Sequence, residues 1–167
     1  MKKIMVIDDT PDFMAFMAML LENEDYRASI RSTGEGIFSL VKKQKPDLII
    51  LDLVLPDING IEVLHLLRED PETRHIPAIV STAALERVQQ AREFLEAQHI
   101  EVLEKPYGLD ELVGAVRRAI GFAGGQDPTA TAGSRPVPDN SWRRFKRTGV
   151  SISEQQATSS WRGGSVA

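Results

Sequence analysis

The fold of this chain is constrained most strongly by a short apolar run that is followed by one carboxylate. Residues 48–51 (LIIL) contain no polar break, and Asp52 follows directly. Pro46 precedes the run and Pro56 follows it, so the pattern predicts a strand buried on both faces of a parallel sheet. Ligands bind at the carboxyl ends of the strands in open α/β sheets. Asp52 is therefore a candidate functional residue, and the alternative is an Asp that caps a helix or begins a turn.

Similar strand patterns recur along the chain and alternate with helical patterns. Strands are predicted at residues 4–7, 27–31, 48–51, 76–80 and 100–103. Helices are predicted at about residues 11–23, from 34–36 onward, and at 59–70, 85–98 and 109–120, from apolar residues at helical spacing. Five strands alternating with five helices predict an α/β fold, a doubly wound five-stranded parallel sheet with helices on both faces.

The composition excludes several classes of chemistry and location. The 167 residues include no cysteine, so there is no disulfide framework, thiolate chemistry or Cys-based zinc site. His65, His75 and His99 lie far apart and are predicted to be surface residues. The N-terminus lacks the apolar region of a signal peptide, and no run approaches the roughly 18 apolar residues of a membrane span. We therefore expect a cytoplasmic protein.

Charge divides the chain into two unequal parts. Residues 121–167 contain six Lys/Arg and three Asp/Glu, a net of +3. Subtraction from the totals of 20 and 24 leaves 14 basic and 21 acidic residues, or −7, for residues 1–120. An acidic globular part argues against nucleic-acid binding by that part, because neutralising phosphates needs a basic face.

Residues 123–167 are predicted to form a low-complexity, disordered tail, because their apolar residues follow no helical or strand period. Within it, Trp142-Arg-Arg-Phe-Lys-Arg147 interleaves aromatic and cationic side chains, and Trp161 is the second tryptophan of the chain. Two interpretations stay open. The cluster could bind an acidic partner, a membrane surface or nucleic acid, or it is a chance grouping in a solvated segment.

Polar residues follow four of the predicted strands, where each strand ends: Asp8-Asp9, Asp52, Thr82 and Lys105. Three carboxylates in close proximity repel one another unless a cation joins them. Oxygen ligands without His or Cys favour a hard ion, and an open site suits Mg²⁺. A divalent ion, a hydroxyl and an ammonium together suit phosphoryl chemistry, with one carboxylate as nucleophile.

These motifs resemble the response-regulator receiver domain of two-component signalling, in order and in spacing. The resemblance covers about residues 1–122, which we predict to be the receiver domain. It implies that Asp52 is the phosphoacceptor and that Thr82 and Lys105 are the hydroxyl and the ammonium that act on the phosphoryl group. It also implies Mg²⁺ ligation by Asp9 and Asp52, by Asp8 through water, and by the backbone carbonyl of Val54.

The resemblance further implies the flavodoxin-like strand order 2-1-3-4-5 and a phosphoryl donor that is a phosphohistidine. That donor would belong to a sensor histidine kinase or a histidine phosphotransfer protein, and the phosphorylated state would act on a downstream protein target. The sequence departs from the family at Val102 and Leu103, where an aromatic residue is common. We therefore expect readout through displacement of the loop at residues 81–85 and of the following helix.

Other functions and contacts stay open at this stage. The chain could be a transcription-linked regulator that acts through a bound partner or the basic tail. A metal-dependent aspartyl phosphatase is less favoured, because Val54 stands where such enzymes carry a second acid; we expect no enzyme activity beyond self-phosphorylation and slow autodephosphorylation. A homodimer on phosphorylation is also open. In the first helix, Met14, Ala15, Ala18 and Met19 are either filler packing or a docking surface for the phosphohistidine partner.

Overall fold

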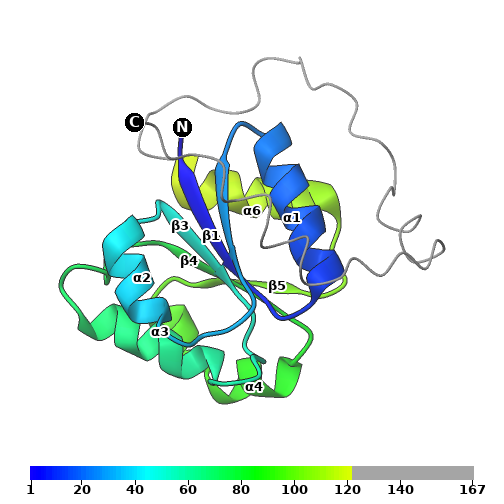
Figure 1. Cartoon of the computed structure of the whole chain (residues 1–167). Coiled ribbons are helices and arrows are strands. Elements are labelled where there is room, and N and C mark those ends of the chain that lie inside the picture. The colour runs from blue at the N-terminus through cyan, green and yellow to red at the C-terminus, as the bar shows by residue number, and fades with distance from the viewer. Residues whose placement is uncertain (122–167) are drawn as a thin grey trace. The chain divides into compact units, whose positions relative to one another are not determined.

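The computed structural model describes residues 1–121, so the predicted tail at residues 123–167, with Trp142 and Trp161, lies outside the described residues. This part of the chain contains five strands and six helices, which alternate except that two helices follow each other between the fourth and fifth strands. Figure 1 shows their arrangement. The strands are β1 (Lys3–Ile7), β2 (Arg27–Arg31), β3 (Leu48–Leu51), β4 (Ala78–Thr82) and β5 (Glu101–Glu104). The helices are α1 (Pro11–Asn23), α2 (Ile37–Gln44), α3 (Gly60–Glu69), α4 (Leu85–Gln90), α5 (Arg92–Ala97) and α6 (Leu109–Gly121).

The strands form one parallel sheet in the order β2-β1-β3-β4-β5, which confirms the predicted fold class and strand order. In the registers of the central strands, Ile7 pairs with Leu51 and Leu51 with Val80. The carboxyl ends of β1, β3 and β4 therefore lie side by side. The residues that follow these ends are brought to one edge of the sheet.

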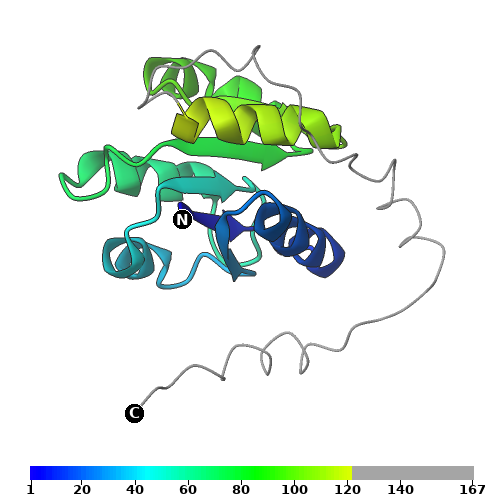
Figure 2. The ribbon, with the colours of Figure 1, turned by 90° about the horizontal axis from the view of Figure 1, so that it is seen from above.

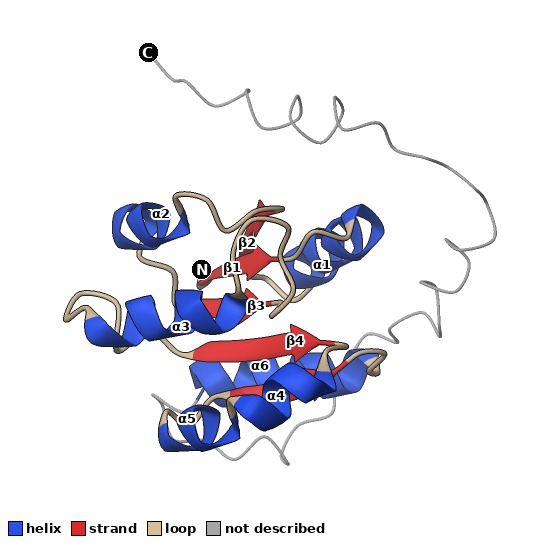
Figure 3. Ribbon diagram, turned by 90° about the horizontal axis from the view of Figure 1, so that it is seen from below, coloured by secondary structure: helices blue, strands red, loops and turns tan. Residues whose placement is uncertain are grey.

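Helices cover both faces of the sheet and bury two apolar layers. Figure 1 shows α1 and α6 on one side of the sheet and α2, α3 and α4 on the other, and Figures 2 and 3 show the same helices from above and from below. Met17, Leu112 and Val116 pack on the first face, and Val41, Leu64 and Leu95 on the second. Strand β3 contributes to both layers, because all four of its side chains are buried. This confirms the prediction of a strand buried on both faces.

Several predicted elements have somewhat different bounds in the structure, among them the fourth strand and the fourth helix. The fourth strand, predicted at residues 76–80, runs from Ala78 to Thr82. Ile76 instead closes a turn, its N–H donating to the carbonyl of Thr73, and Pro77 has no N–H to donate to a ladder. Strand β4 therefore begins later and extends to Thr82, which pairs with Glu104.

The fourth predicted helix, at residues 85–98, is divided at Ala91, so six helices replace the predicted five. Ala91 has φ −100° and ψ 7°, outside the helical region, although hydrogen bonds of the i→i−4 type continue on both sides of it. Helix α5 buries Leu95, whereas no residue of α4 is buried. Helix α4 is consequently the helix with the least anchoring in the described core.

None of the helices in residues 1–121 is both long enough and apolar enough to cross a membrane. His65, His75 and His99 are exposed, as predicted.

Candidate functional site

The fold places Asp52 at the centre of the carboxyl edge of the sheet. Its backbone N–H donates to the carbonyl of Ile7 at 2.9 Å, so the hydrogen-bonded ladder between β1 and β3 continues to this residue. Asp52 is 8% exposed, and Asp8, which follows β1, is 1% exposed. Carboxylates buried to this degree need charged or polar partners.

Three donors surround the carboxylate of Asp52. The Thr82 hydroxyl donates to Oδ1 at 2.8 Å, and the backbone N–H of Val54 donates to the same oxygen at 3.0 Å. Lys105 Nζ donates to Oδ2 at 2.8 Å. Both oxygens are thus held by hydrogen bonds, two of which come from the predicted site residues Thr82 and Lys105. The Thr82 hydroxyl already contacts the carboxylate, and Thr82 is fully buried.

Lys105 also joins Asp8 to the cluster. Its ammonium forms an ion pair and hydrogen bond with Asp8 Oδ2, while the backbone N–H of Thr10 donates to Asp8 Oδ1 at 2.9 Å. Asp9, the next residue, is exposed, and no hydrogen bond to its carboxylate is found among the described residues. The two neighbouring aspartates therefore have different environments, one buried and bound and the other open to solvent.

The segment after Asp52 folds back closely onto the strand that it leaves. The Gly60 N–H donates to the carbonyl of Leu53 at 3.1 Å, and Asn59 caps α3 by accepting from the N–H of Ile61 at 3.0 Å. A Cβ on Gly60 would lie 2.5 Å from the backbone oxygen of Asp52, which only glycine avoids. Val54, 44% exposed, stands on the outside of this segment.

A second group of side chains packs behind the cluster, on the face of the sheet that α1 and α6 cover. The hydroxyls of Ser81 and Tyr107 lie 2.6 Å apart. The rings of Tyr107 and Phe13 pack edge to face, with centroids 6.3 Å apart, and Lys105 Nζ lies 4.4 Å from the centroid of Phe13. Burial raises the pKa of Tyr107 well above the ordinary value, and the hydrogen bond with Ser81 only partly opposes this.

The sequence patterns did not identify these backing contacts. The one available signal was the tyrosine two positions after Lys105, in the order Lys105-Pro106-Tyr107.

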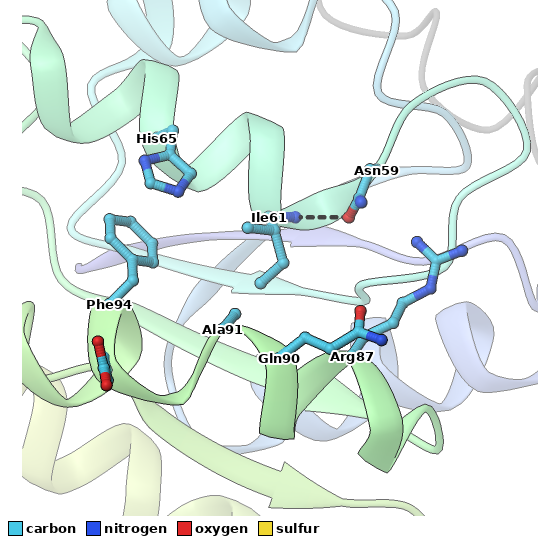
Figure 4. Close-up of a pocket in the computed structure, with 8 residues that line it drawn as sticks. Asn59, Ile61, His65, Arg87, Gln90, Ala91 and Phe94 are labelled. Carbon is cyan, nitrogen blue, oxygen red and sulfur yellow. Dashed lines mark hydrogen bonds between the residues drawn. The ribbon is translucent and has the colours of Figure 1, made fainter.

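A separate pocket of about 320 Å³ lies between α3 and the α4–α5 pair (Figure 4). The rings of His65 and Phe94 stack there with centroids 3.9 Å apart, and Arg87 and Gln90 line the other end. None of the side chains around Asp52 lines this pocket. Two of its lining residues reach the segment that follows Asp52: the Arg87 guanidinium donates to the carbonyl of Leu53 at 3.4 Å, and Asn59 pairs with Val54 in a β-bridge.

The carboxylates of Asp8, Asp9 and Asp52 together form a donor set for a cation. Ligand oxygens of the three lie within 4.8 Å of one another. All are hard carboxylate oxygens, with neither nitrogen nor sulfur donors in the group, and Asp9 leaves the site open to solvent. This donor set fits Mg²⁺, which is bound by a few carboxylates and keeps several of its waters.

The strand order and the cluster at the carboxyl edge define a flavodoxin-like α/β domain. Residues 4–117 match the response regulator receiver domain family, and the chain belongs to that family. Residues 1–121 therefore contain the receiver domain of a response regulator of two-component signalling.

Curated relatives differ in how much of their length this chain covers. The chain is 32% identical over 116 residues to the DNA-binding response regulator MtrA of Mycolicibacterium smegmatis. That alignment covers 70% of this chain and 49% of MtrA. It is 28% identical over 122 residues to the polar-differentiation response regulator DivK of Brucella anthropi, covering 73% of this chain and 98% of DivK. The chain thus spans about half the length of MtrA and nearly all of DivK.

Solved receiver domains share the fold. One is the receiver domain of a sensor histidine kinase from Pseudomonas aeruginosa, with a TM-score of 0.63 and 26% identity over 72% of this chain and 98% of that one. Its structure has a magnesium ion coordinated in the active site cleft.

Proposed function

We propose that this protein is a phosphoacceptor response regulator in which Asp52 takes a phosphoryl group from a phosphohistidine of a sensor histidine kinase or a histidine phosphotransfer protein. The observation that carries the proposal is the set of donors around Asp52. A hydroxyl, an ammonium and a backbone N–H converge on one carboxylate at the carboxyl edge of the sheet. These donors suit the negative charge of a transferring phosphoryl group.

In the proposed transfer, one Asp52 carboxylate oxygen forms a bond to phosphorus while the bond from phosphorus to the histidine nitrogen breaks. The electron pair of the broken bond stays on the imidazole nitrogen, and the proton carried by the other ring nitrogen leaves the imidazole neutral. The product is an acyl phosphate, which carries more charge than the carboxylate it replaces. Lys105 is placed to interact with that added charge, and Thr82 to donate to one phosphoryl oxygen.

Mg²⁺ is the proposed cofactor, held by Asp9 and Asp52, by Asp8 through water, and by the backbone carbonyl of Val54. When bound, the ion would neutralise charge on the phosphoryl oxygens. The acidic trio supports this assignment, as does the magnesium in the Pseudomonas aeruginosa receiver domain.

An aspartyl phosphatase is the alternative from another class, and turnover separates the two. Val54 supplies no acid for a leaving group, so we expect self-labelling followed by slow loss of the label. Incubation with acetyl phosphate and Mg²⁺ should add one phosphoryl mass per chain, with release of phosphate limited by decay of that adduct. Rapid release of many phosphates per chain without an accumulating adduct would favour the phosphatase.

A second proposal concerns how the phosphorylated chain acts. It would regulate transcription through a bound partner or through residues 123–167. The similarity to MtrA favours it, although that protein is about twice as long as the matched segment. A gel-shift assay of the phosphorylated chain, with and without residues 123–167, tests it. A shift that needs those residues supports direct action of the tail, and no shift in either form leaves output through a downstream protein.

A further inference from the structure

Ser81 and Tyr107 connect the site to the layer behind it. Ser81 is 1% exposed, and its hydroxyl has the Tyr107 phenol as its partner. Ser81 directly precedes Thr82 in β4, so their side chains point to opposite faces of the sheet. Fixing the Ser81 side chain on one face therefore fixes the backbone from which Thr82 reaches Asp52 on the other.

Tyr107 is also linked to the ammonium of Lys105, through the ring of Phe13. Its ring packs edge to face against Phe13 at an interplanar angle of 79°, and Phe13 in turn lies 4.4 Å from Lys105 Nζ. An ammonium at this distance is attracted to the face of an aromatic ring. Tyr107 follows Lys105 by two residues, so the same short segment carries both the ammonium and the ring that supports Phe13.

These contacts link Thr82 and Lys105, two of the three donors to Asp52. On one side, Thr82 and Lys105 meet at the carboxylate of Asp52. On the other, Ser81 and Tyr107 are joined by their hydroxyls, and the backbone N–H of Lys105 donates to the carbonyl of Thr82 at 2.9 Å. Three kinds of contact therefore join the end of β4 to the segment after β5: the shared carboxylate of Asp52, a backbone hydrogen bond and the hydrogen bond between Ser81 and Tyr107.

We propose that Tyr107 is a positioning residue for the phosphoacceptor site, which holds Thr82 through Ser81 and Lys105 through Phe13. The inference rests on the proposed function of Asp52 and adds a residue that does not touch the carboxylate. Tyr107, which follows Lys105, is thus an aromatic residue bonded to β4, the strand that carries Thr82. Val102, in β5, has no ring.

A purely structural role for Tyr107 makes a different prediction, and a double-variant cycle separates the two. Tyr107→Phe and Ser81→Ala each remove one hydroxyl of the pair, and the double variant removes both. Leaving one buried hydroxyl without a partner destabilises a protein, whereas removing both partners together is nearly neutral. Stability should therefore fall in each single variant and recover in the double variant.

Labelling should behave differently from stability. With acetyl phosphate and Mg²⁺, each single variant should label about two- to tenfold more slowly than the wild type, as expected for loss of one hydrogen bond that orients the site. The double variant should label as slowly as the singles, because Thr82 is still released from Tyr107. Tyr26→Phe, at the other tyrosine of the chain, is the matched control and should label at the wild-type rate.

Recovery of labelling together with stability in the double variant would overturn the inference and leave Tyr107 a core residue. Labelling of Tyr107→Phe at the same rate as Tyr26→Phe would also overturn it. Both outcomes leave the proposed function intact, since Asp52 is labelled in each. A wild-type chain that takes up no phosphoryl group would instead refute the proposed function, and the inference would fail with it.

Discussion

The two aspartates after β1 differ in how their carboxylates are used within the protein. Asp8 is buried, and its oxygens accept from Lys105 and from the N–H of Thr10. Asp9 is exposed and adjacent to the same cluster. A carboxylate that is open to solvent can exchange water for a cation directly, whereas one already held by an ammonium has less capacity to do so.

Asp9→Asn should therefore weaken Mg²⁺ binding more than Asp8→Asn does. Calorimetric titration of Mg²⁺ into each variant measures the difference, at equal ionic strength so that net charge is screened alike. Equal losses of affinity in the two variants would contradict the assignment of Asp9 as the direct ligand.

Tyr107 should make the free energy of unfolding depend on pH in the alkaline range. Its pKa is raised by burial, so the folded chain holds the phenol proton more tightly than the unfolded chain. Its contribution to stability is complete below about pH 10, the ordinary tyrosine value, and is lost as the pH rises above that value. Tyr107→Phe should cost about 1 kcal/mol at neutral pH, because Ser81 loses its partner, and should lose less stability than the wild type at high pH.

Denaturant unfolding at neutral and alkaline pH measures both effects, with Tyr26→Phe as the control. An alkaline loss of stability that is the same in Tyr107→Phe as in the wild type would show that another group titrates there.

At the scale of elements, α1, which begins just after Asp8 and Asp9, presents apolar side chains to solvent. Met19 is 47% exposed, and Met14 and Ala18 are partly buried, so Met19 is the best position at which to test docking without disturbing the core. Leu66 in α3, on the other face of the sheet, is also 47% exposed and is a matched control.

If α1 docks the phosphohistidine partner, Met19→Glu should slow transfer from that partner by roughly tenfold, because a charge in an apolar contact is left unpaired. Labelling by acetyl phosphate should not change, and Leu66→Glu should affect neither reaction. Slower reaction with both donors in Met19→Glu would indicate a folding defect rather than lost docking.

Helix α4 is the element most able to move when the site changes. It buries no residue, and its Arg87 reaches the carbonyl of Leu53, next to Asp52. Phosphorylation should therefore shift amide signals most at Thr82–Arg87, with Tyr107 affected through Ser81 and Val102 only weakly. Two-dimensional NMR of the chain before and after phosphorylation tests this. Shifts at Val102 as large as those at Thr82 would place the coupling in β5 instead.

The elements themselves could be predicted where one local signal dominates. An unbroken apolar run such as residues 48–51 and the regular spacing in α6 gave the correct type of element, and the carboxyl-edge rule correctly placed Asp52 beside Thr82 and Lys105. The start of β4 was misplaced because Ile76 is as apolar as a strand residue, yet its N–H is used in a turn. The break at Ala91 was missed because alanine favours a helix and no proline or glycine marks the position.

At the scale of the whole molecule, the strand order brought together residues that the sequence separates widely. Asp52, Thr82 and Lys105 were predicted to meet because parallel strands share one edge, and they do so in the structure. The bond between Ser81 and Tyr107 joins residues 26 positions apart and has no periodic signal. Contacts of that kind depend on the side-chain packing of the finished fold, so strand patterns alone could not identify them.

The central claim is that Asp52 accepts the phosphoryl group, and Asp47 provides a matched control. Asp47 directly precedes β3, as Asp52 directly follows it, but it accepts hydrogen bonds from the backbone N–H of Lys3 and the ammonium of Lys2 at the opposite edge of the sheet. Intact mass spectrometry after incubation with acetyl phosphate and Mg²⁺ should find one added phosphoryl mass on the wild type and on Asp47→Asn. It should find none on Asp52→Asn, with the fold of that variant checked by circular dichroism. An adduct on folded Asp52→Asn at the wild-type level would contradict the claim.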